Sequence, residues 1–303
     1  MDAQALKQEI EKLKKQKNAV ILAHNYQNSD ILDVADYIGD SFNLAQRGLE
    51  VDADIIVFCG VTFMAETAKI LTPEKKVLIP SLAAICPMAA MIDLVSVRKL
   101  RAEHPSAATV CYVNTTADVK AECDVCCTSA NAVAIVNSLP NDEVIMVPDR
   151  HLADYVAENT DKKIIPAEGF CYVHSKIKPE AVIKAKRKYP DAEVLLHPEC
   201  PAETLKLADH VFSTAGMLNH VMNSDCEDFI IGTEHGMVEV LKRHAPNKGF
   251  VPVGGICVQQ KKIDIQRVYE CLRDEKNEVT VDPEVAKGAL KAIKKMLNVG
   301  RHD

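Results

Sequence analysis

Three phrases of this sequence end in the same way: Val77-Leu-Ile-Pro-Ser-Leu-Ala-Ala-Ile-Cys86, Ile164-Ile-Pro-Ala-Glu-Gly-Phe-Cys171 and Phe250-Val-Pro-Val-Gly-Gly-Ile-Cys257. Each joins a short apolar run to a proline and closes on a cysteine, and the cysteines recur at intervals of 85 and 86 residues. Self-similarity at a fixed period indicates an array of similar structural units. The sequence therefore predicts three units, 1–86, 87–171 and 172–257, followed by residues 258–303.

The three units share one order of predicted elements. A Lys- or Arg-rich helix precedes an apolar run that ends in a polar tripeptide, at His24-Asn-Tyr26, Tyr112-Val-Asn114 or His197-Pro-Glu199. A helical stretch, a second apolar strand (54–59, 143–147 or 228–232), a further helix and the short strand before the cysteine follow. Such alternation is typical of parallel sheets with right-handed crossovers. We predict an α/β fold of three similar three-layer domains with parallel sheets, in a pseudo-threefold arrangement around a central cavity.

The ends of the chain carry helical patterns. Residues 1–18 place Leu6, Ile10 and Leu13 on one face of an amphipathic helix. Two further helices are predicted at 263–273 and 282–297, and we expect both to pack back on the first unit. In parallel sheets, functional residues gather beyond the carboxyl ends of the strands. The polar tripeptides and the three cysteines all lie at such ends, so we expect them to meet in one cavity.

The overall composition limits the function classes. The 303 residues carry a net charge of −7, and a surface of that sign repels nucleic-acid phosphates and anionic lipid. The N-terminal helix lacks the apolar centre of a signal peptide, and no apolar run reaches membrane-spanning length. We therefore expect a cytoplasmic protein with no nucleic-acid or membrane partner. Thiols stay reduced in that compartment, so the eleven cysteines are not expected to form disulfides.

Three of the cysteines are predicted metal ligands. Cys86, Cys171 and Cys257 occupy equivalent strand ends, which chance burial would not repeat three times. Thiolates select zinc, copper(I) or iron-sulfur clusters; a structural zinc requires a fourth ligand, for which no equivalent cysteine exists. A 4Fe-4S cluster held by three thiolates leaves one iron open as a Lewis acid. The other eight we interpret as structural, including the Cys123 and Cys126 pair in a predicted helical stretch.

Acid-base and hydroxyl groups accompany these cysteines. The strand ends and their neighbours supply His24, Tyr26, Tyr112, His174, His197 and Glu199, which can transfer protons. The hydroxyl groups of Ser41, Ser129, Ser213 and Thr214 near helix starts are either plain N-caps or parts of an anion site. The remaining histidines, His210 and His220 among them, are predicted to be structural.

Eight motifs in order resemble the quinolinate synthase family over nearly the whole chain. They are Ala23-His-Asn-Tyr26-Gln, Gly39-Asp-Ser41, Cys111-Tyr-Val-Asn114-Thr-Thr, Cys127-Thr-Ser129-Ala-Asn131, Gly169-Phe-Cys171-Tyr-Val-His174, His197-Pro-Glu199-Cys, Ser213-Thr-Ala-Gly-Met217 and Gly232-Thr-Glu234-His-Gly236. The resemblance implies three similar α/β domains around a 4Fe-4S cluster, with ligands at Cys86, Cys171 and Cys257.

The same resemblance implies the reaction and the site. Iminoaspartate, delivered by an aspartate-oxidising enzyme, condenses with dihydroxyacetone phosphate to quinolinate for NAD synthesis, with loss of phosphate and two waters. The substrate-binding residues implied are His24, Ser41, Tyr112, Asn114, Ser129, His174, His197, Glu199, Ser213 and Thr214. Tyr26, Tyr112, His197 and Glu199 are the catalytic candidates, and their acid and base roles stay open.

One departure and two alternatives accompany this hypothesis. Val258-Gln-Gln260 follows the third cysteine where the family often has Asn-Met, which leaves the surroundings of that ligand open. An iron-sulfur hydro-lyase acting on a preformed hydroxy acid would need the same open iron but no phosphate site. A redox or iron sensor would need few of the polar residues predicted around the cavity.

Overall fold

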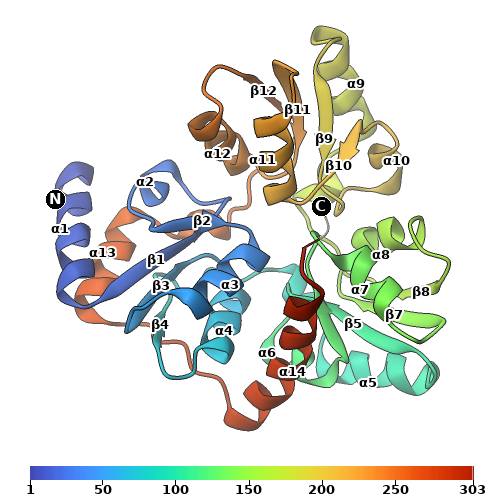
Figure 1. The fold of residues 1–303 in the computed structure, drawn as a ribbon, viewed down its shortest axis with the longest axis horizontal. Helices are drawn as coiled ribbons and strands as arrows, with labels where there is room; N and C mark the ends of the chain where they lie inside the picture. Colours follow the sequence, from blue (N-terminus) through green and yellow to red (C-terminus); the bar gives the residue numbers. More distant parts are fainter. Residues whose placement is uncertain (302) are drawn as a thin grey trace.

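The computed structural model of the chain describes residues 1–301 and 303. It contains three four-stranded parallel sheets, one within each predicted unit, arranged around a common centre (Figure 1). The strand orders are β2-β1-β3-β4, β6-β5-β7-β8 and β10-β9-β11-β12, which is one topology repeated three times. The predicted α/β fold of three similar domains is confirmed. The boundaries at 86, 171 and 257 stay a prediction.

The strands are short and, at the centre of each sheet, buried. The first sheet contains β1 (Ala19–His24), β2 (Tyr37–Gly39), β3 (Ile55–Cys59) and β4 (Lys76–Leu78). The second contains β5 (Ala108–Tyr112), β6 (Val125–Cys127), β7 (Glu143–Val147) and β8 (Lys163–Pro166). The third contains β9 (Glu193–Leu196), β10 (His210–Val211), β11 (Asp228–Gly232) and β12 (Gly249–Pro252). Apolar runs form the central strands because helices cover both faces.

The helices follow the same threefold pattern. In the first unit they are α1 (Ala3–Gln16), α2 (Ser29–Leu32), α3 (Ser41–Glu50) and α4 (Thr62–Leu71). The second has α5 (Leu94–Glu103), α6 (Ala117–Glu122), α7 (Ala132–Ser138) and α8 (Arg150–Ala157), and the third has α9 (Pro179–Lys188), α10 (Ala202–Leu205), α11 (Thr214–Asn223) and α12 (Gly236–His244). Each predicted ligand cysteine is followed by a short 3-10 helix: η1 (Met88–Met91), η2 (His174–Lys176) or η3 (Gln260–Lys262).

One aspartate contact recurs in every sheet. The residue before each edge strand, Asp36, Asp124 or Asp209, accepts a hydrogen bond from a backbone N–H of the neighbouring central strand at 2.7, 2.8 and 2.8 Å respectively. Each carboxylate also faces a cation from the preceding helix, namely Lys14, Arg101 or Lys186. The contact holds the start of each edge strand against its central strand. Because it recurs, it gives a common reference point for comparing the three units.

The structure corrects three sequence predictions. The edge strands β2, β6 and β10 were not predicted, because two or three residues are too few to show a period. Cys126 therefore lies in β6 rather than in a helical stretch. Helix α13 (Ile265–Asp274) packs on α1 as expected, but α14 (Pro283–Val299) lies mainly against α6 and β6 of the second unit. Every helix in residues 1–301 is too short or too polar to cross a lipid bilayer.

Candidate active site

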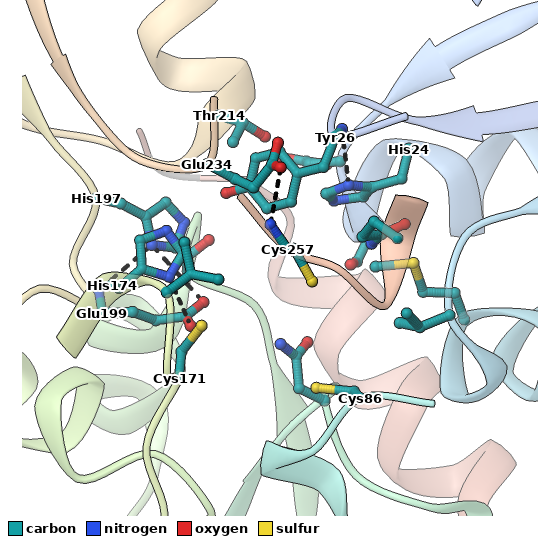
Figure 2. A pocket seen from close by; sticks show the side chains of 18 of the residues that line it. His24, Tyr26, Cys86, Cys171, His174, His197, Glu199, Thr214, Glu234 and Cys257 are labelled. Atoms are coloured by element: carbon teal, nitrogen blue, oxygen red, sulfur yellow. Dashed lines mark hydrogen bonds and ion pairs between the residues drawn. The ribbon is translucent and has the colours of Figure 1, made fainter. Parts of the chain in front are cut away.

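The carboxyl ends of the three sheets face one cavity (Figure 2). It encloses about 690 Å³, counting its opening to solvent. Of the predicted site residues, the structure brings these to its walls: His24, Tyr26, Ser41, Cys86, Tyr112, Asn114, Ser129, Cys171, His174, His197, Glu199, Thr214 and Cys257. Ser213 instead lines a smaller neighbouring cavity.

Cys86, Cys171 and Cys257 reach this cavity from three different sheets, and Figure 2 shows their side chains converging on its centre. Burial raises the pKa of Cys86 to about 12 and the pKa of Cys171 well above its ordinary value. The neutral form of the Cys86 and Cys171 thiols is favoured until a bound cation offsets the burial. Three converging, partly buried soft donors fit an iron-sulfur cluster or another thiophilic metal.

A buried carboxylate holds the loop of Cys257. Glu234 is fully buried; its Oε1 accepts a hydrogen bond from the backbone N–H of Cys257 at 3.0 Å, and its Oε2 accepts one from Gly236 at 2.6 Å. Lys261 Nζ lies 3.5 Å from Oε1 and donates to the carbonyl of Tyr26. The first and third units are thereby joined beside the third cysteine.

The segment after Cys257 is held by a contact between two glutamines. Gln260 is buried and lines the cavity. Gln27 Nε2 donates hydrogen bonds to the backbone carbonyl of Gln260 at 3.1 Å and to its side-chain oxygen at 2.6 Å. A glutamine of the first unit, Gln27, therefore fixes the backbone that follows the third cysteine.

Glu199 is the central carboxylate of the site. Tyr112 donates its hydroxyl hydrogen to Glu199 Oε1 at 2.6 Å, and His174 Nδ1 lies 3.2 Å from Oε2. Burial favours the neutral acid, but the contacts with His174 and with the Tyr112 hydroxyl outweigh it and lower the pKa of Glu199 to about 2. Glu199 is thus an ionised, fully buried proton acceptor. Its carboxylate, a ring nitrogen of His174 and the Cys171 sulfur lie within 4.8 Å of one another.

His24 and His197 occupy equivalent positions in the first and third units, and both imidazole rings make the same hydrogen bond to the backbone. Nδ1 of each ring accepts a hydrogen bond from the backbone N–H two residues later, Tyr26 at 3.2 Å or Glu199 at 3.3 Å. Burial lowers the pKa of His24 to about 4 and that of His197 to about 3. Both rings are therefore neutral with the proton on Nε2, which makes them hydrogen-bond donors to a substrate oxygen.

Tyr26 and His174 share a hydroxyl partner. The Tyr26 hydroxyl lies 2.7 Å from Thr233 Oγ1, and His174 Nε2 lies 2.9 Å from the same atom. Burial and the charge of Glu199 raise the pKa of both Tyr26 and Tyr112 well above the ordinary value. The two phenols therefore stay protonated and can donate.

Residues from all three units meet the end of the chain beside the cavity. Arg301 donates to Asp40 Oδ2 at 3.0 Å and to Ser213 Oγ at 2.5 Å, and Asn131 donates to the carbonyl of Gly300 at 2.8 Å. Asp40, Asn131 and Ser213 are the N-cap residues of α3, α7 and α11. Their neighbours Ser41, Ser129 and Thr214 line the cavity, so residues 300–301 tie three helix starts together there.

Sequence reasoning missed several of these residues. Thr233 and Glu234 stand in the motif Gly232-Thr-Glu234-His-Gly236, and Asp40 stands beside Ser41 in Gly39-Asp-Ser41. These motifs mark a place in the chain but do not indicate what the three side chains contact. Arg301 had no local signal, since its partners lie far away in the sequence.

The fold and the site together define an enzyme of the α/β class with a buried, thiol-lined active centre. Comparisons with known proteins identify its family. The sequence profile of the quinolinate synthetase A protein family matches residues 8–298. The chain is similar to the quinolinate synthase of Methanoregula boonei, with 49% identity over 98% of this chain and 99% of the relative. The quinolinate synthase of Clostridium novyi is 50% identical over 96% of this chain and 98% of the relative. The chain belongs to the quinolinate synthetase A protein family.

Proposed function

We propose that this chain is a quinolinate synthase that condenses iminoaspartate with dihydroxyacetone phosphate, releasing phosphate and two waters, and that Cys86, Cys171 and Cys257 hold a 4Fe-4S cluster in its cavity. The observation that carries the proposal is the ionised Glu199 held by Tyr112 and His174 where three cysteines from three units converge. Family membership supports the reaction. When bound, such a cluster supplies one iron without a protein thiolate, a Lewis acid for substrate oxygen.

Substrate orientation is assigned to the neutral imidazoles and the helix starts. His24 and His197 present Nε2–H donors to the cavity, and such donors suit the carboxylates of iminoaspartate. The hydroxyl groups of Ser41, Ser129 and Thr214 lie at or near the starts of α3, α7 and α11. Free backbone N–H groups and the helix dipole favour an anion at such places. We assign the phosphate of dihydroxyacetone phosphate to them, with Asn114 beside it.

Proton transfer is assigned to Glu199 and the two phenols. Loss of water from a carbon skeleton needs a base for the C–H proton and an acid for the departing hydroxyl. Glu199 is ionised and its low pKa makes it a weak base, so its strength must come from exclusion of water and from close placement. Tyr112 and Tyr26 stay protonated and serve as donors to the departing oxygen.

The partners of the proposed enzyme are small molecules. Iminoaspartate hydrolyses readily in water, so an aspartate-oxidising enzyme close to this chain is the expected supplier. The cytoplasm is the expected location, by the sequence argument given above.

The direct test mixes cluster-loaded protein with both substrates without oxygen and follows quinolinate by chromatography and mass spectrometry. We expect quinolinate in more than stoichiometric amount, and none when dihydroxyacetone phosphate is omitted. Fully loaded protein that forms no quinolinate, but dehydrates a simple hydroxy acid, would replace this proposal by the hydro-lyase alternative.

A further inference from the structure

A second group of metal-ligating side chains lies on the third unit, away from the cavity. Glu193 is the first residue of β9, His210 begins β10 and His220 lies near the end of α11. One ligand atom from each lies within 4.8 Å of the other two. The cavity residues His197 and Glu199 follow the last residue of β9. The two sites therefore lie at opposite ends of the strands of the same sheet.

The three side chains are already ordered around a common point. His220 Nε2 lies 2.6 Å from Glu193 Oε2, and the rings of His210 and His220 have centroids 4.3 Å apart. The Glu193 and His220 side chains retain 30% and 21% exposure, so an ion can enter from solvent. Phe212 and Phe229 contact the His220 ring from the protein side.

The other two units show that the fold does not require these residues. Counting from the aspartate before each edge strand, the positions of Glu193 and His210 correspond to Val20 and Tyr37 in the first unit. The position of His220, six residues into its helix, corresponds to Arg47, whose guanidinium lies 5.2 Å above the Tyr37 ring.

The second unit gives the same comparison. The positions of Glu193 and His210 there correspond to Ala108 and Val125. None of the corresponding residues named for the first two units is a histidine or a carboxylate, whereas the third unit has two imidazoles and a carboxylate.

We propose that Glu193, His210 and His220 bind a divalent transition-metal ion of the Zn²⁺ class. Two imidazole nitrogens and one carboxylate oxygen suit Zn²⁺, which completes its shell with water. Ligand atoms within 4.8 Å need to move by less than about 1 Å to reach bond lengths near 2.1 Å.

The site would strengthen a weak part of the third unit. β10 has only two residues and two register pairs with β9. An ion shared by β9, β10 and α11 would tie this edge strand to its neighbours, and binding to the folded state alone stabilises that state.

The test uses cluster-loaded protein, so that the thiols of the cavity cannot bind the added zinc. The remaining thiols are the same in every variant, so any zinc that they bind cancels in the comparison. Parent, Glu193→Gln, His220→Gln and the control His104→Gln are equilibrated with Zn²⁺, dialysed and analysed for zinc. We expect the parent and His104→Gln to hold one more equivalent than the two site variants.

Melting temperature supplies a second readout that does not depend on activity. Zn²⁺ should raise it by about 3 °C or more in the parent and in His104→Gln, and leave Glu193→Gln unchanged; this variant keeps the size of the side chain. Equal zinc content and equal melting shifts in parent and Glu193→Gln would overturn the proposal and leave a hydrogen-bonded surface cluster. Neither result bears on the proposed formation of quinolinate, because the readouts are zinc content and melting temperature.

Discussion

The Tyr112 hydroxyl and the Glu199 carboxylate meet at 2.6 Å although they belong to different sheets. Tyr112 ends β5 of the second unit, and Glu199 follows β9 of the third. Both side chains are buried, so the contact forms only when the two units are correctly placed. The proposed proton acceptor, Glu199, is therefore held in place only when the second and third units are packed together.

Replacing Glu199 by Gln should keep the fold and the cluster but nearly abolish quinolinate formation. An amide retains the shape of the side chain but cannot accept a proton, and loss of such a group lowers the rate by about 100-fold or more. The rate is measured on variants matched for iron content, with the exposed Glu203→Gln as the control. Turnover within tenfold of the parent would remove Glu199 from the mechanism.

Replacing Arg301 by Ala should loosen the three helix starts beside the cavity. Arg301 holds Asp40 and Ser213, next to the proposed phosphate-binding residues Ser41 and Thr214. We expect KM for dihydroxyacetone phosphate to rise by about 10-fold, with kcat and iron content changed by less than about threefold. The exposed Lys294→Ala on α14 should behave as the parent. An unchanged KM in Arg301→Ala would show that this contact does not shape the phosphate site.

Much of this architecture was predictable, and the exceptions share a cause. The central strand Ala19–His24 and the strands at 143–147 and 228–232 were predictable because burial on both faces produces continuous apolar runs. The three cysteines were identifiable by their spacing. The edge strands are too short to carry a pattern, and the contacts of Arg301 join residues up to 261 positions apart. The sequence predicts structural roles for His210 and His220, because isolated histidines give no sign that their side chains converge.

Replacing Glu275 by Gln should lower stability at neutral pH and remove part of its acid dependence. Lys17 and Lys76 each bind the Glu275 carboxylate at 2.6 Å and lower its pKa to about 2. A lowered carboxyl pKa stabilises the fold above the ordinary pKa of about 4.5, and this contribution is lost as the pH falls toward 2. Since the side chain is about one-third exposed, solvent screening limits the effect to about 1 kcal/mol or less.

Urea unfolding at pH 7 and pH 3 checks this difference, with the exposed Glu74→Gln as the control. The gap between parent and Glu275→Gln should be present at pH 7 and smaller at pH 3. A gap that is equal at both values would mean that the ionisation of Glu275 does not contribute.

The metal centre is tested most directly by iron and sulfide content in single cysteine variants. Cys86→Ala, Cys171→Ala and Cys257→Ala should each fail to hold a 4Fe-4S cluster after anaerobic reconstitution, while circular dichroism shows an intact fold. Cys59→Ala, Cys123→Ala and Cys226→Ala should each keep the iron and sulfide content of the parent. A full cluster in Cys171→Ala would contradict the assignment of the three thiolates as its ligands.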